Sequence, residues 1–402
     1  MQTRFAIGLA ALLALSGPAL AANPPPQPKA GMPGGANNPD AEVVKRSVGR
    51  ASAVTYVFHL AKEPEQPRPV VVFLHGWGAV NPSVYGGWID HLVRRGYLVL
   101  YPAFQTVGRT RPPDATKNAT ALVKDALAAL ENDPKAKPDL SKLAYLGHSA
   151  GGGVAVNLAA DPAAAGLPVP KLVFITMVGG IASDEKSRGI QLADLSKVDP
   201  QTSIVAMIGD REFQASDRAS RRILRQASEV PQTKKLFMRV ASDDHGFPSL
   251  SATLASPGSP MSAYDSAGIK VEPDPPVDPR APRVPQPKWS ADMVLSGEQH
   301  VLLAQLGRNP IDTLDHLAFW KTFDMAADTA FNGSGDLAAL RNDPAFLDMQ
   351  RWSDTWPIRR LHAEHPRPVD ATATAPVVRA APAPTKMPVT RQRKRERDRD
   401  RR

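Results

Sequence analysis

The chain has 402 residues, no cysteine and a formal net charge of +9 at pH 7. Without cysteine it can form neither disulfides nor a zinc site built on cysteine ligands. A chain of this length can bury a core large enough to fold without such cross-links.

The first 21 residues have the layout of a secretory signal peptide. Arg4 precedes an apolar run over residues 5–15, and Ala19-Leu20-Ala21 then forms an Ala-x-Ala cleavage site. The apolar run is too short to span a bilayer, and no later stretch is long, apolar and uncharged. We therefore expect an exported protein, periplasmic or secreted, with no transmembrane segment in the mature chain. Residues 22–42, rich in Pro, Gly and Asn, are expected to form a disordered leader.

Residues 43–364 alternate between strand-like and helix-like segments and are expected to form one domain. Strands are expected at 54–60, 70–74, 97–101, 142–146, 172–177, 204–208 and 236–240. Helices are expected at 82–95, 115–130, 154–160, 218–226 and 311–331, with a shorter helix within 336–349. This alternation predicts an α/β fold with a mostly parallel central sheet and helices on both faces.

One motif lies between an expected strand and an expected helix. It is Gly147-His148-Ser149-Ala150-Gly151, and it follows the apolar run 142–146 and precedes the Ala/Val-rich segment 154–160. A Gly-x-Ser-x-Gly motif can also be an ordinary glycine-rich turn. Strand, motif and helix in this order favour instead the nucleophile elbow, which holds a serine hydroxyl exposed on a tight turn. Ser149 is therefore the candidate nucleophile.

A serine nucleophile needs a base to take its proton, and a histidine usually has that role. His245 lies in the loop that follows the expected strand 236–240, where a ring can lie over the elbow. The alternatives later in the chain are His300, His316, His362 and His365. We favour His245, because His316 falls inside an expected helix and His362 and His365 lie close to the C-terminal tail.

An acidic side chain must orient the base, and on this fold it precedes the histidine in the chain. Asp210 and Glu212 follow the expected strand 204–208. Many proteins with this elbow have Gly-x-x-Asp after the corresponding strand, a spacing that places the acid at Glu212. Asp210 is the alternative acid.

Attack on an ester carbonyl also requires N–H donors for the developing oxyanion. One is the amide of the residue after the nucleophile, Ala150, and the other comes from a loop after an earlier strand. The loop His75-Gly76-Trp77-Gly78 follows the expected strand 70–74, and its glycines allow the Trp77 amide to turn inward. We expect His75 to be a structural residue beneath this loop.

These motifs, in this order, resemble the α/β-hydrolase superfamily, and most closely exported bacterial carboxylesterases of the dienelactone hydrolase, cutinase and polyester hydrolase group. The resemblance covers roughly residues 54–245. It implies a catalytic site made of the following residues: Ser149 as nucleophile, His245 as base, Glu212 or Asp210 as acid, and the amides of Trp77 and Ala150 as oxyanion hole.

The sequence thus predicts a serine hydrolase that cleaves carboxylic esters, small or polymeric, through an acyl-enzyme on Ser149, with no metal and no cofactor. A peptidase or amidase on the same fold is one alternative. A catalytically silent binding protein with a hydrolase fold is another.

Two segments depart from the alternating pattern. Residues 256–288 are rich in proline, cannot form a regular element, and are expected to shape the substrate entrance. Residues 365–402 are expected to be a disordered tail, whose last twelve residues carry eight basic and three acidic side chains. Such a tail suits an anionic envelope polymer as partner. It has no aromatic residue with which to stack nucleic-acid bases, so no specific nucleic-acid binding is expected.

Overall fold

The computed structural model describes residues 21–35, 39–211, 214–276, 288–293, 295 and 298–364. The predictions of a signal peptide and of a basic, disordered tail fall on residues outside this part of the chain, and so does Glu212. Export and the nature of the tail therefore stay predictions. None of the helices in the described ranges combines the length and apolarity that crossing a membrane requires.

Nine strands of the described residues form one sheet in the order β1-β2-β4-β3-β5-β6-β7-β8-β9. Their bounds are β1 (Val43–Arg50), β2 (Ala53–Leu60), β3 (Arg68–Leu74), β4 (Leu98–Pro102), β5 (Pro138–His148), β6 (Leu172–Thr176), β7 (Ser203–Gly209), β8 (Lys235–Val240) and β9 (His362–Glu364). The pairings from β4 through β8 are parallel, whereas β1, β2 and β9 run antiparallel to their neighbours. The central strands are buried on both faces, as their continuous apolar sequences predict.

The helices follow the strands in alternation. They are α2 (Gly86–Arg94), α3 (Ala115–Leu130), α4 (Ala150–Ala160), α5 (Pro162–Ala165), α6 (Gln214–Gln226), α7 (Glu298–Leu306), the π-helical segment η8 (Leu314–Trp320), α8 (Lys321–Asn332) and α9 (Pro344–Leu347). Short 3₁₀ turns lie at Pro82–Tyr85, Pro112–Asp114, Leu195–Lys197, Gln232–Lys234, Ser262–Tyr264, Ser266–Gly268, Ala291–Met293 and Leu340–Asn342.

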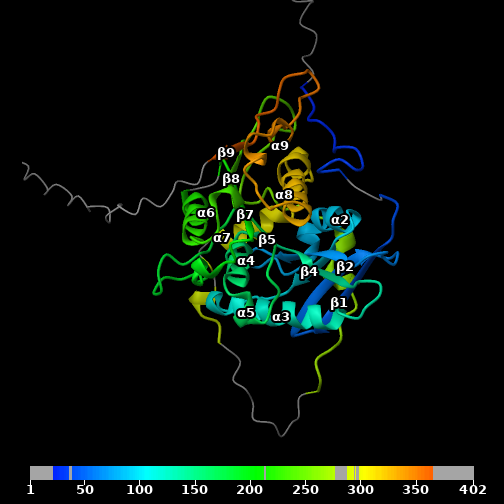
Figure 1. The fold of residues 1–402 in the computed structure, drawn as a ribbon, viewed down its shortest axis with the longest axis vertical. Coiled ribbons are helices and arrows are strands. Elements are labelled where there is room, and N and C mark those ends of the chain that lie inside the picture. Colours follow the sequence, from blue (N-terminus) through cyan, green and yellow to red (C-terminus); the bar gives the residue numbers. More distant parts are fainter. Residues whose placement is uncertain are drawn as a thin grey trace, which may run out of the picture. The chain divides into compact units, whose positions relative to one another are not determined.

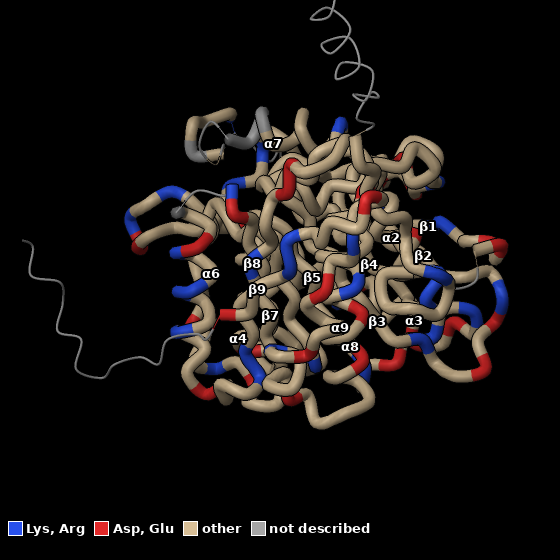
Figure 2. Tube along the Cα trace, turned by 90° about the horizontal axis from the view of Figure 1, so that it is seen from above, with Lys and Arg blue, Asp and Glu red and all other residues tan. Residues whose placement is uncertain are grey.

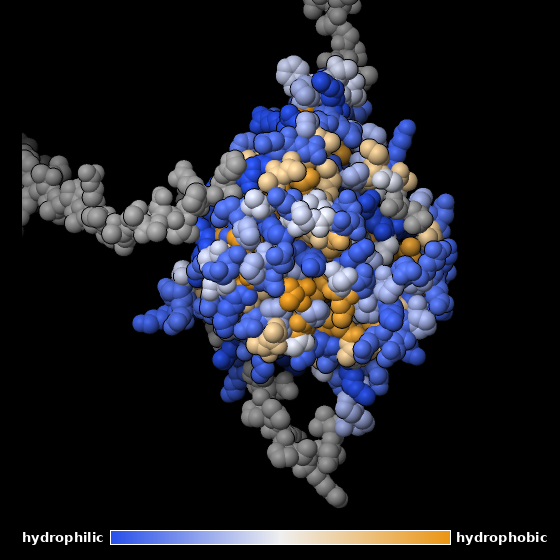
Figure 3. Space-filling model, viewed as in Figure 1, coloured by the Kyte–Doolittle hydropathy of each residue, from blue (hydrophilic) through white to orange (hydrophobic). Residues whose placement is uncertain are grey.

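Helices cover both faces of the sheet. α2 and α8 pack on one face, where both contact η8, and α3 and α4 pack together on the other, as Figure 1 shows. Figure 2 shows charged residues mostly around the periphery of the tube, with few in the central strands. The surface facing the viewer in Figure 3 is largely hydrophilic. Its most strongly hydrophobic area lies in the region of α3, α4 and α5, and a paler area lies toward the top of the view. The predicted α/β class is confirmed.

One expectation about a single segment needs correction: the shorter helix expected within 336–349 is only a 3₁₀ turn at Leu340–Asn342 and the single turn α9. The expected helix 311–331 is present, and its first part is the π-helical segment η8, which runs directly into α8. The described part of the proline-rich segment packs on the domain: Gly87 of α2 donates to Ser259 O (2.7 Å) and Ala51 donates to Glu272 O (2.9 Å). No contact recorded for the described residues 256–276 reaches Ser149 itself, so a role for the proline-rich segment at the substrate entrance stays a prediction.

Residues 22–35 were expected to be a disordered leader, but they lie in fixed contacts against the domain. Ala22 is only 7 % exposed, and its carbonyl accepts a hydrogen bond from the Phe247 amide (2.9 Å). Asn23 exchanges two hydrogen bonds with Ser353, each 2.9 Å long. The composition of this segment indicated disorder. Its hydrogen-bond partners, Phe247 and Ser353, lie more than 200 residues away in the chain, and local composition carries no information about such contacts.

The same segment ends on a buried ion cluster between α2 and α8. The Asp324 carboxylate, whose side chain is fully buried, accepts from the Gly34 amide (2.8 Å) and from His91 Nε2 (3.1 Å). Arg95 Nε lies 3.1 Å from the same carboxylate. One side chain thus connects the N-terminal segment, α2 and α8.

Replacing Asp324 with alanine should destabilise the fold by about 3–5 kcal/mol, because it leaves a guanidinium and buried N–H donors without their acceptor. Urea denaturation measures this loss. The matched control is Asp328→Ala, one turn further along α8 at an exposed position, which should change the free energy of unfolding by less than about 0.5 kcal/mol. Equal effects of the two substitutions would contradict a structural role for the cluster.

Candidate active site

The turn at Ser149 has the geometry of a nucleophile elbow. Ser149 lies between the last residue of β5 and the first residue of α4, with φ 51° and ψ −119°. This left-handed backbone costs a non-glycine residue of order 1–3 kcal/mol. It is possible because Gly147 and Gly151 pack so closely that a Cβ at either position would collide with neighbouring backbone. The strand–turn–helix predicted around Ser149 is present.

A chain of buried hydrogen bonds surrounds the elbow. His148 Nε2 lies 2.8 Å from the Leu254 carbonyl, which can only accept, so Nε2 carries the proton. Burial lowers the pKa of His148 to about 4 and keeps the ring neutral, so Nδ1 is an acceptor. The Tyr85 hydroxyl donates to Nδ1 (2.7 Å), and its oxygen accepts from the Gly76 amide (3.1 Å). The chain thereby connects the loop after β3, the elbow and the loop after β8.

The two amides predicted as oxyanion donors lie in the loop after β3, at Trp77, and at the start of α4, at Ala150. Neither the Trp77 amide nor the Ala150 amide donates to another group within the described residues, as free oxyanion donors require. The Trp77 side chain is 2 % exposed, and its indole N–H donates to the Met293 carbonyl (3.2 Å). The Gly78 amide donates to Gln105 Oε1 (2.6 Å), which holds the loop in place.

His75 lies beneath this loop, as expected for a structural residue. Its ring is fully buried and stacks on Phe104, with centroids 4.1 Å apart. Nδ1 donates to the Gly76 carbonyl (2.8 Å). Burial lowers the pKa of His75 to about 4, so this ring is also neutral.

His245 has an acidic partner that the sequence did not indicate. Its Nε2 donates to Asp354 Oδ2 (2.7 Å), and its ring stacks on Trp356 with centroids 5.3 Å apart. The hydrogen bond to His245 holds the pKa of the Asp354 carboxyl below its usual value. Asp354 lies 109 positions after His245 in the chain. No local sequence pattern links residues so far apart, so the sequence pointed only to the acids that follow β7.

The loop after β8 does reach the elbow, but at a different residue. Asp243 and Leu250 exchange two backbone hydrogen bonds of 2.8 Å, so the residues between them form the tip of a hairpin. The returning arm passes the elbow, where the Leu254 carbonyl binds His148. His245 lies at the tip, and no contact recorded among the described residues joins it to Ser149.

The other predicted acids and bases are distributed as follows. Asp210 accepts hydrogen bonds from the Ser242 amide (2.9 Å) and hydroxyl (2.6 Å) and makes none with His245 in the described part of the chain. His316 packs edge-on against Trp320, and burial lowers its pKa to about 4. His362 is exposed in β9, and His300 belongs to α7.

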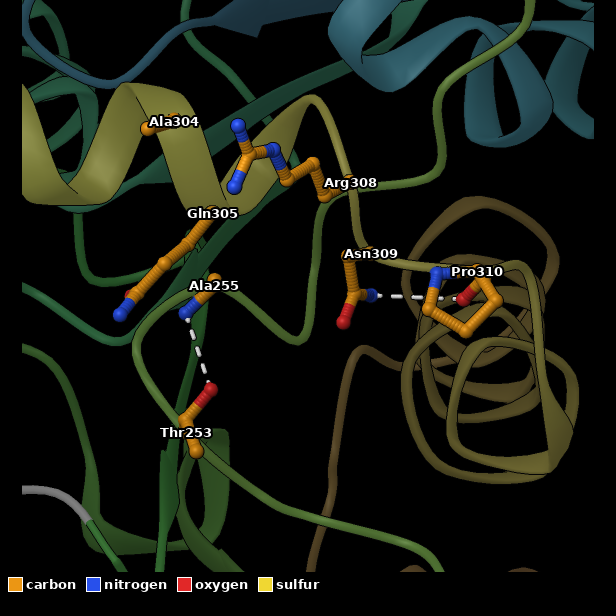
Figure 4. Close-up of a pocket in the computed structure, with 7 residues that line it drawn as sticks. All are labelled: Thr253, Ala255, Ala304, Gln305, Arg308, Asn309 and Pro310. Carbon is orange, nitrogen blue, oxygen red and sulfur yellow. Dashed lines mark hydrogen bonds between the residues drawn. The ribbon is translucent and has the colours of Figure 1, made fainter. Parts of the chain in front are cut away.

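α7 lies close to this region. Leu302 Cδ2 would be 3.7 Å from a Cβ at Gly76, in the loop after β3. The C-terminal end of α7 and the arm 253–255 border an open cavity of about 590 Å³, shown in Figure 4. Ala304 and Gln305 line it from the helix, and Arg308 lines it from the residues that follow. The arm therefore lies between the outer cavity and His148.

The mostly parallel sheet and the strained serine at the β5–α4 turn define an α/β-hydrolase, so the superfamily that the motifs resemble is confirmed. Residues 45–209 match the family model described as Chlorophyllase, which supports a hydrolase of this type. The matched part is less than half of the chain. It contains Trp77, Ser149 and Ala150 and ends before Asp210 and His245. No curated protein matches the chain.

The neutral state of His148 predicts a change in acid stability. Between pH 6.5 and pH 4 the unfolded chain binds a proton at His148 and the folded chain does not. The free energy of unfolding therefore falls as the pH is lowered through this range. The free energy of unfolding of His148→Gln should therefore fall less steeply with decreasing pH than that of wild type, by about 1.4 kcal/mol per pH unit.

Urea denaturation between pH 7 and pH 4.5 measures this slope. The matched control is Tyr145→Phe on the same strand, because the Tyr145 hydroxyl is buried with no hydrogen-bond partner among the described residues. This control should keep the wild-type slope. A wild-type slope in His148→Gln would show that His148 is charged in the folded protein.

Proposed function

We propose that the protein is a serine hydrolase that cleaves carboxylic esters through an acyl-enzyme on Ser149. The observation that carries the proposal is the strained backbone of Ser149 at the elbow. Two amides with no acceptor recorded among the described residues accompany it: that of Ala150, at the elbow, and that of Trp77, in the loop joined to the elbow by the hydrogen-bond chain. A backbone in a costly conformation persists where the surrounding structure holds it, and such sites are often catalytic.

The proposed reaction has two steps. Ser149 Oγ loses its proton to a base and attacks the ester carbonyl, and the negative charge on the carbonyl oxygen is met by the two amides. The tetrahedral intermediate collapses, the base returns the proton to the leaving alcohol, and an acyl-serine ester remains. Water activated by the same base then attacks this ester and releases the acid and free Ser149.

The base cannot be His148, because both of its ring nitrogens are committed in the hydrogen-bond chain. We propose His245 as the base and Asp354 as the carboxylate that orients it, since these two side chains already form a hydrogen bond. Nδ1 is then the nitrogen that takes the proton, and the hairpin tip must bring it to Ser149. Asp210 and Glu212 are the alternative acids.

Replacing Ser149 with alanine should lower kcat for short p-nitrophenyl esters by at least about 10³-fold and leave the fold intact. A fluorophosphonate should label wild type at Ser149 and should not label the variant. Ser141→Ala, at an exposed position on β5, is the control and should keep full activity. Wild-type turnover by Ser149→Ala would disprove the assignment, and faster cleavage of a matched anilide than of the ester would favour an amidase.

Replacing His245 with glutamine should lower kcat/KM by about 10²–10⁴-fold, the usual contribution of a general base. His362→Gln, in exposed β9, should retain wild-type activity. His300→Gln tests the histidine carried by α7. If His300→Gln is inactive while His245→Gln is active, His300 is the base, and the role of Ser149 is unaffected.

A further inference from the structure

The space beside the Ser149 hydroxyl is bounded by the turn that follows β6. A Cβ placed on Gly179 would lie 3.4 Å from Ser149 Oγ, and its next neighbour would be the Met177 carbonyl at 3.9 Å. An alanine therefore fits at this position without a clash. The hydrogen atoms of Gly179 face a group that any bound ester must approach, so the size of residue 179 affects how much of a substrate fits there.

Leu295 closes the next position along this turn. Its Cδ1 would lie 2.6 Å from a Cβ at Gly180, whose φ is 67°. Leu295 is 9 % exposed and lies seven residues after the end of the proline-rich segment. Leu295 can pack on this turn because residue 180 is a glycine; a larger residue there would clash with it.

The segment that carries Leu295 is anchored on both sides. Before it, the Met293 carbonyl accepts the indole N–H of Trp77 (3.2 Å). After it, Leu302 and Leu306 of α7 are buried, and Asn309 Nδ2 donates to the Gly258 carbonyl (2.7 Å). The described residues on either side of Leu295 are therefore anchored on the domain, and Leu295 itself packs against Gly180, the neighbour of Gly179.

The chemistry of this wall is apolar. Leu295 packs on Gly180, and Met293 and Trp77 adjoin it in the chain and through their hydrogen bond; all three side chains are apolar and nearly or fully buried. A charged substituent would lose its hydration here without gaining a counter-charge. An uncharged aliphatic or aromatic group would bury its surface at no such cost.

We propose that Leu295 and the Gly179–Gly180 turn form the specificity wall of the active site and set the size of an uncharged substituent of the ester beside Ser149. This proposal rests on the proposed esterase function and adds the substrate class to it. Substitutions at the two positions should have opposite effects on the size of the substituent that fits, because Leu295→Ala enlarges the space beside Ser149 and Gly179→Ala reduces it.

The test measures kcat/KM over two substrate series. In one the acyl chain grows from acetyl to decanoyl on a fixed p-nitrophenol, and in the other the alcohol grows from methanol to decanol on a fixed acetyl group. In one of these series, Leu295→Ala should raise the ratio of long-chain to short-chain kcat/KM by about 10-fold or more. Gly179→Ala should lower the ratio in the same series by a similar factor.

The control is Leu303→Ala on α7, at a position that is 38 % exposed, which should leave both series unchanged. Stoichiometric fluorophosphonate labelling of each variant shows that Ser149 and the fold are intact. Unchanged ratios in labelled Leu295→Ala and Gly179→Ala would overturn the specificity wall and leave the esterase function standing. Absence of labelling and of ester cleavage in wild type itself would instead overturn the proposed function.

Discussion

The hydrogen-bond chain from Gly76 through Tyr85 and His148 to Leu254 is the constraint on which the rest of the site depends. Because the ring of His148 is neutral, the donor and the acceptor of each of the three hydrogen bonds are determined: the Gly76 amide donates to Tyr85, Tyr85 to His148, and His148 to the Leu254 carbonyl. The three segments that it joins come from different parts of the chain. Because the links from Gly76 to His148 are buried, breaking one of them leaves polar groups without partners, which costs about 1–3 kcal/mol each.

This constraint also explains why a strained serine can be held in a fold that has no disulfides. The strain at Ser149 is offset by the close packing of Gly147 and Gly151 and by the hydrogen bonds on either side of the turn. The surrounding aromatic side chains exclude water and keep the rings of His75 and His148 neutral. Stability and preorganisation therefore come from the same buried groups.

The sequence predicted those parts of the structure that local patterns encode. The apolar runs that became β3, β6 and β7 and the Gly-x-Ser-x-Gly elbow all have short-range signals of period or motif. It could not predict the pairing of His245 with Asp354 or the docking of Ala22 on the hairpin tip. Those contacts join residues far apart in the chain and are selected by packing, which no local composition reveals.

The family match also covers only one part of the candidate site, the part that local sequence patterns predicted. The match to a known family ends at Gly209, the last residue of β7, and so contains Ser149 and the loop after β3. The hairpin tip, Asp354 and Leu295 all come from the chain beyond it. In the proposed mechanism, attack and charge stabilisation depend on the matched elements, whereas proton transfer and choice of ester depend on segments outside the match. Because Leu254 ties the second set to the first through His148, a change in the later segments can reach the elbow without altering any residue of the elbow itself.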